Sequence, residues 1–195
     1  MAVSRALRLA KRVNELLEAN GSPTKPVQLK VLLPSLEHGS LEDENYLQDR
    51  WAALLANAAN PQHQQTILPV FVEILRQLSI NDARLLEKFH KEAGRSSDDN
   101  LDIGGIETLL SLYWEAFPNG EDGEFRIALE NLVRLGLLIR HQKRSGTNTF
   151  FFAAEYEEDQ GSTVIENRYN FTKLGLSFVL TCRPTKDDEE YPEVT

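Results

Sequence analysis

The chain has 195 residues, of which 41% are hydrophobic and 26% are charged, so it is expected to fold around a buried core. Its single cysteine, Cys182, excludes an intramolecular disulfide and a zinc site built from several thiolates, and it favours a reducing compartment. The formal net charge of −9 repels phosphate backbones at long range, which confines any nucleic-acid role to a local basic patch.

Residues 1–20 are predicted to form an amphipathic helix, because apolar side chains recur there at helical spacing. The apolar stripe consists of Val3, Leu7, Ala10, Val13 and Leu17. A second side is basic, which is typical of a solvated face, and carries Arg5, Arg8, Lys11 and Arg12. A tethered helix of this kind is stable only when its apolar stripe is covered. We therefore expect the stripe to pack on the protein's own bundle, on a second subunit or on another protein.

Residues 21–40 are predicted to be a linker, since three prolines interrupt them and leave room only for a short turn of helix around Val31–Leu33. Residues 41–94 predict a central bundle of three helices. Two of them are expected to begin at capping patterns, at Ser40 and at Ser79, each with an aspartate three residues later. The apolar stripes of the three helices predict one core, made of Trp51, Leu54, Leu55, Phe71, Ile74, Leu75, Leu85 and Phe89.

Residues 95–183 predict a winged-helix-like C-terminal part that shares the helix of residues 80–93. A loop is expected first, followed by two helices over residues 103–117 and 124–135. Gly136 suits the left-handed end of the second helix, and Thr172 suits the cap of a last helix. Short strands are expected between those two points, over residues 137–142, 149–156 and 163–171.

The predicted fold class is therefore mainly α: a helical bundle followed by a winged-helix-like unit with a small antiparallel β-hairpin or sheet. Residues 184–195 lack a core-forming pattern and are expected to be a disordered acidic tail. The longest uncharged stretch, Trp51–Val72, contains several Asn, Gln and Pro residues, so no membrane span is expected. Charged residues from Arg8 to Glu15 leave no apolar core for a signal peptide, and a cytoplasmic location is expected.

The recognition helix of the winged-helix-like unit, residues 124–135, has a mixed charge. Arg126, Asn131 and Arg134 are suited to contact DNA, but Glu124 and Glu130 oppose phosphates. The basic cluster that follows is the more plausible nucleic-acid contact, through Arg140, Lys143 and Arg144. The alternative interpretation of this cluster is a solvated hairpin, because it is small for a nucleic-acid binder.

Catalytic and metal-binding patterns are sparse. The four histidines lie in different segments without the i, i+4 pairing of a metal site, and no cofactor motif is present. One enzymatic pattern is relevant, because ribonucleases of the HEPN class place Arg four to six residues before His. Arg84 and His90, with five residues between them, fit this spacing, and so do Arg134 and His141, with six between them. Such a pair suits RNA cleavage because His transfers a proton while Arg stabilises the phosphate.

Several blocks of the sequence resemble a known family. The central block is the most specific, with Leu33-Pro34-Ser35-Leu36-Glu37, Ser40-Leu41-Glu42-Asp43-Glu44 and Leu47-Gln48-Asp49-Arg50-Trp51-Ala52-Ala53-Leu54-Leu55-Ala56-Asn57-Ala58. Further matching blocks begin at Leu68, at Asn131 and at Tyr169. Together they are similar to the Abi-alpha (abortive infection alpha) family of bacterial and phage-encoded proteins, over roughly residues 28–182. The resemblance implies a mostly helical protein connected with defence against phage, and it carries over no catalytic residues.

Two classes of function compete on this basis. The first is a non-enzymatic interaction or regulatory module that binds a protein partner, with self-association through the first helix. The second is a nucleic-acid-directed protein, either a winged-helix DNA binder or a HEPN-like ribonuclease. The acidic charge, the sparse catalytic patterns and the mixed recognition helix favour the first class, with no cofactor and no membrane partner.

Overall fold

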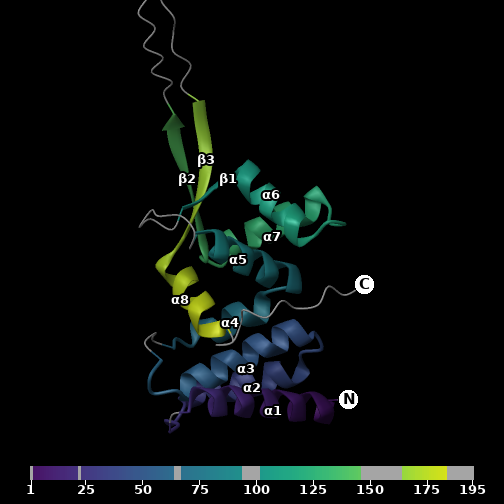
Figure 1. Ribbon diagram of the computed structural model, residues 1–195, viewed down its shortest axis with the longest axis vertical. Coiled ribbons are helices and arrows are strands. Elements are labelled where there is room, and N and C mark those ends of the chain that lie inside the picture. The colour runs from purple at the N-terminus through teal and green to yellow at the C-terminus, as the bar shows by residue number, and fades with distance from the viewer. Residues whose placement is uncertain (1, 22, 64–66, 94–101, 146–163, 184–195) are drawn as a thin grey trace, which may run out of the picture.

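The structure is a computed structural model that describes residues 2–21, 23–63, 67–93, 102–145 and 164–183 (Figure 1). Within these ranges the chain forms eight helices and one antiparallel sheet of three strands, so the fold is mainly α, as predicted. The strand expected over residues 149–156 and the tail expected over residues 184–195 lie outside the described residues.

Helices α1 (Ala2–Asn20), α2 (Leu29–Leu41) and α3 (Asn45–Ala59) pack against one another at one end of the molecule (Figure 1). Helix α2 shows that the linker prediction was wrong for residues 29–40. It continues through Pro34, although an interior proline costs about 3 kcal/mol, because tertiary packing outweighs local propensity. Gly39 makes this packing close, since an added Cβ would lie 2.9 Å from Leu9 Cδ2 and 3.0 Å from Trp51 Cβ.

The two capping patterns have different outcomes. Ser40 does not begin a helix; it lies in the last turn of α2, where its hydroxyl donates to the Glu37 carbonyl, and α3 begins at Asn45. Ser79 does cap helix α5 (Ile80–Ala93), after the short helix α4 (Val70–Gln77). The Ser79 hydroxyl accepts from the Asp82 amide at 3.1 Å, and the Asp82 carboxylate accepts from the Ser79 amide at 2.8 Å. This reciprocal pair is a complete capping box.

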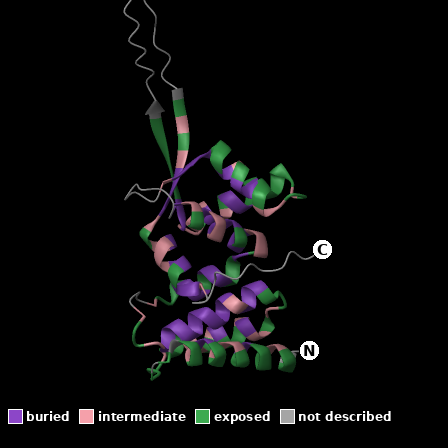
Figure 2. Ribbon diagram, in the orientation of Figure 1, coloured by how far each residue is buried: buried purple, intermediate pink, exposed green. Residues whose placement is uncertain are grey.

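One contiguous core runs through the molecule from Leu9 to Cys182. All eight residues predicted for the central core are buried in it, none more than 3% exposed, which confirms that prediction. Helix α8 (Lys173–Cys182) closes back onto α3, where the Asn57 side-chain amide donates to the Thr181 carbonyl at 2.8 Å. Figure 2 shows that the buried residues concentrate in α3 and in the faces of the helices that surround it.

The sheet has the strand order β1-β3-β2, with β1 (Asp102–Gly105), β2 (Leu138–Ser145) and β3 (Val164–Phe171) all antiparallel. Helices α6 (Ile106–Ala116) and α7 (Asp122–Arg134) lie between β1 and β2 in the sequence. The helix expected from residue 103 therefore begins three residues later, because residues 102–105 pair with β3 instead. The order of the described elements from α5 onward is helix, strand, helix, helix, strand, strand, so β1 is a strand that the sequence did not predict, while β2 and β3 lie near the strands expected over residues 137–142 and 163–171.

Two predicted helix caps are present where the helices meet the sheet, one after α7 and one before α8. Gly136 adopts a left-handed conformation with φ of +71° just after α7, as expected for a helix end. The Thr172 hydroxyl caps α8 by accepting from the Gly175 amide at 2.8 Å, and it donates to the Gly136 carbonyl at 2.6 Å. A single side chain thus joins the end of α7 to the start of α8. Among the described helices, none has the length and apolar character needed to span a bilayer.

Candidate interaction surfaces and the interior ion pair

Helix α1 is attached to its neighbours through its basic residues. Arg5 donates to the carbonyl of Leu41 at 2.7 Å, and Arg8 donates to the side chains of Asn45 and Gln48. Arg12 forms an ion pair with Asp49 at 3.2 Å. The three arginines, expected on a solvated face, thus contact α3 and the end of α2.

Gln48 is the central polar residue of this attachment. It is only 2% exposed and comes from the first turns of α3. Its side-chain amide donates to the Gly39 carbonyl at 3.0 Å and to the Arg5 carbonyl at 3.2 Å, so it joins all three helices. A buried amide with these partners is satisfied, and it fixes the rotation of α1 about its own axis.

The fixed rotation divides the predicted apolar stripe of α1. The residues that α1 buries are Leu9 and Leu16, which lie between the basic side and the stripe and are 1% and 4% exposed. Val13 and Leu17 are partly buried against the core. The first half of the stripe faces solvent, with Val3 74% exposed, Leu7 67% exposed and Ala10 also exposed.

Helix α2 presents a second set of exposed apolar side chains. Leu29, Leu33 and Leu36 are 66%, 59% and 43% exposed, and their spacing of four and three residues places them on one side of the helix. The two helices run antiparallel, since Arg5 reaches Leu41 and Leu9 lies against Gly39. We call Val3, Leu7 and Ala10 of α1 with Leu29, Leu33 and Leu36 of α2 the two-helix apolar surface. In the antiparallel register the two sets are offset along the helix pair, so that they approach each other at Ala10 and Leu36.

Sequence reasoning missed the α2 half of this surface. The helical spacing of Leu29, Leu33 and Leu36 was visible in the sequence, but the three nearby prolines favoured a linker. The spacing was the correct signal, because an apolar repeat at i, i+4 and i+7 has no reason to arise in an extended segment.

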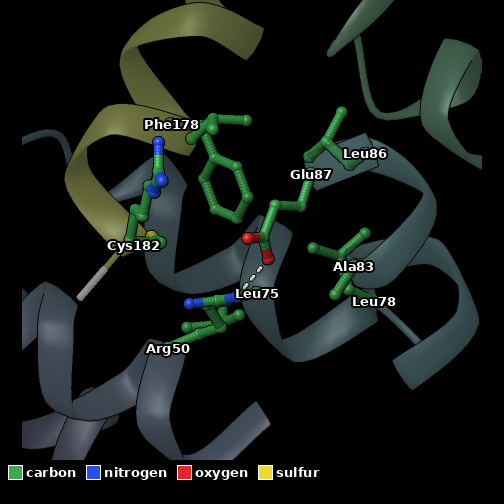
Figure 3. A pocket seen from close by; sticks show the side chains of 10 residues that line it. Arg50, Leu75, Leu78, Ala83, Leu86, Glu87, Phe178 and Cys182 are labelled. Atoms are coloured by element: carbon green, nitrogen blue, oxygen red, sulfur yellow. Dashed lines mark hydrogen bonds and ion pairs between the residues drawn. The ribbon is translucent and has the colours of Figure 1, made fainter. Parts of the chain in front are cut away.

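A small cavity lies among α3, α4, α5 and α8 (Figure 3). Its volume is about 30 Å³, and its walls are mostly apolar side chains such as Leu75, Leu86 and Phe178. Figure 3 shows the side chains of Arg50 and Glu87 pointing toward each other beside it and forming an ion pair. A space of this size holds one or two water molecules and is far smaller than a typical ligand pocket of about 300–1,000 Å³.

The ion pair is part of a three-residue polar cluster, made of Tyr46, Arg50 and Glu87. The Tyr46 hydroxyl donates to the Glu87 carboxylate, and the Arg50 guanidinium lies 4.4 Å from the centre of the Tyr46 ring. Lys91 approaches Glu87 at 3.4 Å. Arg50 and Glu87 are only 7% and 15% exposed, so the cluster connects α3 to α5 through a partly desolvated contact.

The pKa values of the cluster follow from burial and charge. Burial alone raises the pKa of Glu87, but Arg50, the Tyr46 hydroxyl and Lys91 together outweigh it, so the carboxyl titrates below its ordinary value. Burial raises the pKa of the Tyr46 hydroxyl, and it also raises that of the Cys182 thiol at the cavity wall. The thiol is therefore protonated and poorly nucleophilic. The cluster has the features of a structural contact between the two helices.

The predicted Arg–His pairs do not converge. Arg84 lies 5.5 Å from the centre of the Tyr46 ring, whereas the His90 ring meets Phe171 edge-on at 5.9 Å. Six residues along a helix turn the side chain by about 240° from its starting direction, which separates the two groups. Burial lowers the pKa of His90, and the positive charge of the nearby Arg183 lowers it further. Its Nδ1 atom is buried without a hydrogen-bond partner among the described residues.

The second Arg–His pair is also separated, because its members belong to different elements. Arg134 is on α7 and donates to the side chains of Gln77 and Asn131. His141 is exposed on strand β2. Over the described part of the chain, no group of three or more His, Cys, Asp or Glu side chains is placed to hold a metal ion.

The structure also places the residues predicted to contact nucleic acid. On α7, Asn131 donates to the buried Asp82 carboxylate at 2.8 Å, and Arg134 reaches Gln77, so both are occupied within the protein. Glu124 and Glu130 are exposed. On β2, Arg140 and Lys143 are exposed, and their odd spacing places them on opposite faces of the strand.

Arg144, the third residue of the predicted basic cluster, lies opposite Ile165 in the β2–β3 register. The three residues are therefore in a strand rather than at a turn. Arg140 and Lys143 do not share one face.

A comparison with protein families matches residues 4–182 to the family described as abortive infection alpha. Searches of curated proteins and of solved structures give no match. The family match runs from residue 4 in the first turn of α1 to the end of α8, and it includes the α2 and α3 blocks that carried the resemblance in the sequence. The chain therefore belongs to the Abi-alpha (abortive infection alpha) family.

Proposed function

We propose that this protein is a non-enzymatic interaction module in bacterial defence against phage and that it acts by binding a protein partner through the two-helix apolar surface. The observation that carries the proposal is the exposure of that surface. Five of its six side chains are large and apolar, and each of the five is between 43% and 74% exposed. Large apolar side chains left exposed along two packed helices are typical of an interaction site.

The way α1 is attached strengthens this proposal. A surface helix usually turns its apolar stripe inward, but the arginine contacts and Gln48 hold α1 with half of its stripe outward. Those contacts are specific and polar, so the outward direction of Val3 and Leu7 is built into the packing of α1. A partner that covers these side chains gains the free energy of removing them from water.

The interior supports a non-enzymatic role in the same proposal. The Arg50–Glu87 cluster adjoins a cavity with room for water only, and the Cys182 thiol beside it is protonated. Neither Arg–His pair brings its two side chains together. Arg50, Glu87, Cys182 and His90 each contact neighbouring side chains of the fold, and His141 is exposed on β2.

Plaque formation in a phage-challenged bacterial host provides the test. We expect expression of the wild-type chain to lower plaque formation, and Leu7→Glu combined with Leu33→Glu to abolish that effect by placing two charges on the apolar surface. The matched control is Ile127→Glu, because Ile127 is 70% exposed but lies on α7. Circular dichroism of each purified variant verifies the fold. An undiminished effect in the folded double variant contradicts this role of the surface.

The ribonuclease alternative is tested in the same host. His90→Ala and His141→Ala are expected to retain the effect on plaque formation, since neither histidine meets its arginine. RNA cleavage by the purified wild-type chain that disappears in either variant would replace the interaction proposal with the enzymatic one.

A DNA-binding role is the second candidate, and the packing of helices α5, α6 and α7 with the sheet of order β1-β3-β2 favours it. The internal contacts of Asn131 and Arg134 and the negative charge of the chain weigh against it. Titration of a labelled duplex at physiological salt distinguishes the two roles. We expect weak binding that Arg140→Ala, Lys143→Ala and Arg144→Ala together remove; tight binding that survives all three changes favours a DNA reader.

A further inference from the structure

Helices α6 and α7 frame an open groove of about 790 Å³. Its apolar side is a stripe on α6 with a residue on each successive turn: Ile106, Leu110 and Trp114. Ile106 is 40% exposed and Trp114 is 37% exposed, so both are available to a partner. Ser111 lies on the same side of α6 and is small and exposed.

We propose that this groove binds helix α1 of a second copy of the chain, through Val3, Leu7 and Ala10. The inference rests on the proposed function, because it names a partner for the α1 half of the two-helix apolar surface. In Figure 1, α1 and α6 lie in opposite parts of the molecule, so α1 cannot enter the groove of its own chain. The contact therefore joins two molecules.

The two stripes agree in length. At a rise of about 1.5 Å per residue, Val3 to Ala10 covers about 10 Å of helix, and Ile106 to Trp114 covers about 12 Å. Leu7 is near the centre of the first stripe, and Leu110 is at the centre of the second. One helix laid along the other can thus bring all three apolar residues of α1 against the groove.

The charges are complementary as well. Residues 102–125 contain six Asp and Glu residues and no Lys or Arg. Two of the acidic residues line the groove, Glu107 and Glu115, and Glu115 is paired with Lys88 at 2.6 Å. Residues 2–20 contain four Lys and Arg residues and two Glu. Lys11, one turn after Leu7, has a side chain that is 79% exposed, and its ion pair with Glu15 at 3.7 Å is a solvent-exposed one that contributes little and can be exchanged for a partner carboxylate. Arg126 is the single cation among the groove-lining residues.

In this contact the α1 stripe of one molecule meets the groove of another. Each dimer therefore still has one unoccupied groove and one uncovered α1 stripe. Such a head-to-tail contact continues into longer assemblies unless the geometry closes a ring. The assembly is therefore expected to grow with protein concentration and to weaken at high salt, because salt screens the charge complementarity.

Two single variants that each remove one side of the contact provide the test. Leu7→Glu places a charge on the α1 stripe, and Ser111→Arg fills the groove and adds a cation without removing a packed side chain. Sedimentation velocity at rising concentration is expected to show growing assemblies for the wild type and monomers for each variant. An equimolar mixture of the two variants is expected to form a discrete heterodimer, since one retains an intact groove and the other an intact α1.

Trp114→Ala serves as a second groove variant, and Ile127→Glu serves as the control that still assembles. The groove contact is overturned if the wild type forms a closed dimer that Leu7→Glu abolishes and Ser111→Arg leaves intact. In that case the two-helix apolar surface still binds a partner, namely the same surface of a second copy, so the proposed function survives. A wild-type chain that stays monomeric at every concentration also overturns the inference. The plaque assay then decides separately whether the apolar surface binds a different protein.

Discussion

Helices α3 and α1 are neighbours of similar length, with 15 and 19 residues, but they are buried to very different degrees. Thirteen residues of α3 are buried, whereas α1 buries only Leu9 and Leu16 among its described side chains. The difference follows from the number of packed neighbours. Helix α3 contacts α1, α2, α5 and α8, but α1 contacts α2 and α3.

The two helices also use their polar residues differently. In α3 the buried polar side chains Gln48, Arg50 and Asn57 each bond to another helix, so they connect α3 to α1, α2, α5 and α8. In α1 the polar residues form the attachment itself, which leaves apolar residues at the surface. A hydrophobic pattern therefore reports that a helix has an apolar side, whereas the neighbouring polar contacts decide whether that side is covered.

The largest expected effect is at the centre of α3. Leu55→Ala should lower the free energy of unfolding by about 4 kcal/mol, since Leu55 is 3% exposed and its loss leaves a cavity in a packed core. Urea denaturation measures the change. A loss under about 0.5 kcal/mol, the size of a surface substitution, would mean that α3 is not the packed centre of the fold.

Glu87→Gln is expected to cost about 3 kcal/mol at pH 7, because it leaves the Arg50 guanidinium buried without its charged partner. The folded pKa of Glu87 lies below the ordinary value of 4.5, so its carboxylate stabilises the fold above pH 4.5 and that contribution is lost as the pH falls further. The gap between the wild type and the variant should be constant from pH 7 to about 5 and narrow below 4.5.

Urea denaturation at several pH values measures this gap. Because the glutamine side chain of the variant does not titrate, any narrowing on acidification comes from the wild-type carboxyl. A gap that widens as the pH falls would show that the Arg50–Glu87 contact raises the carboxyl pKa instead.

Gly39→Ala tests how closely α1, α2 and α3 approach. Alanine gains about 1 kcal/mol of helix propensity, but its Cβ would lie 3.0 Å from Trp51 Cβ, and overpacking costs about 1–3 kcal/mol. We expect a net loss of about 1 kcal/mol in thermal or urea denaturation. Gly123→Ala is the matched control, because nothing lies within 4 Å of its added Cβ and the change should stabilise α7. Equal stabilisation by both changes would contradict the close approach.

The smallest expected effect is on the outer side of α1. Leu7→Ala should change the free energy of unfolding by less than about 0.5 kcal/mol, because Leu7 is 67% exposed. Leu9→Ala, two residues away, should cost about 2–5 kcal/mol because Leu9 is 1% exposed. The pair is measured at a concentration low enough to keep the chain monomeric. Similar losses of unfolding free energy for the two variants would show that α1 does not bury Leu9 while exposing Leu7.

Much of the fold was predictable from local patterns. The core of α3, α4 and α5, the capping box at Ser79, and the caps at Gly136 and Thr172 each depend on neighbouring residues in the chain, and each is present. Helix α2 was missed because proline statistics describe an isolated helix, whereas tertiary packing at Val31 and Gly39 offsets the local cost.

By itself, the sequence determined the fold class, the central core and the presence of an amphipathic first helix, because periodicity and capping act over a few residues. Only the tertiary structure decided which side of α1 is covered, since that depends on Gln48 and Asp49, about forty residues away. It also decided that Arg84 and His90 face different neighbours and that Glu87 meets Arg50. Contacts between distant segments depend on how whole helices pack, and no local spacing encodes them.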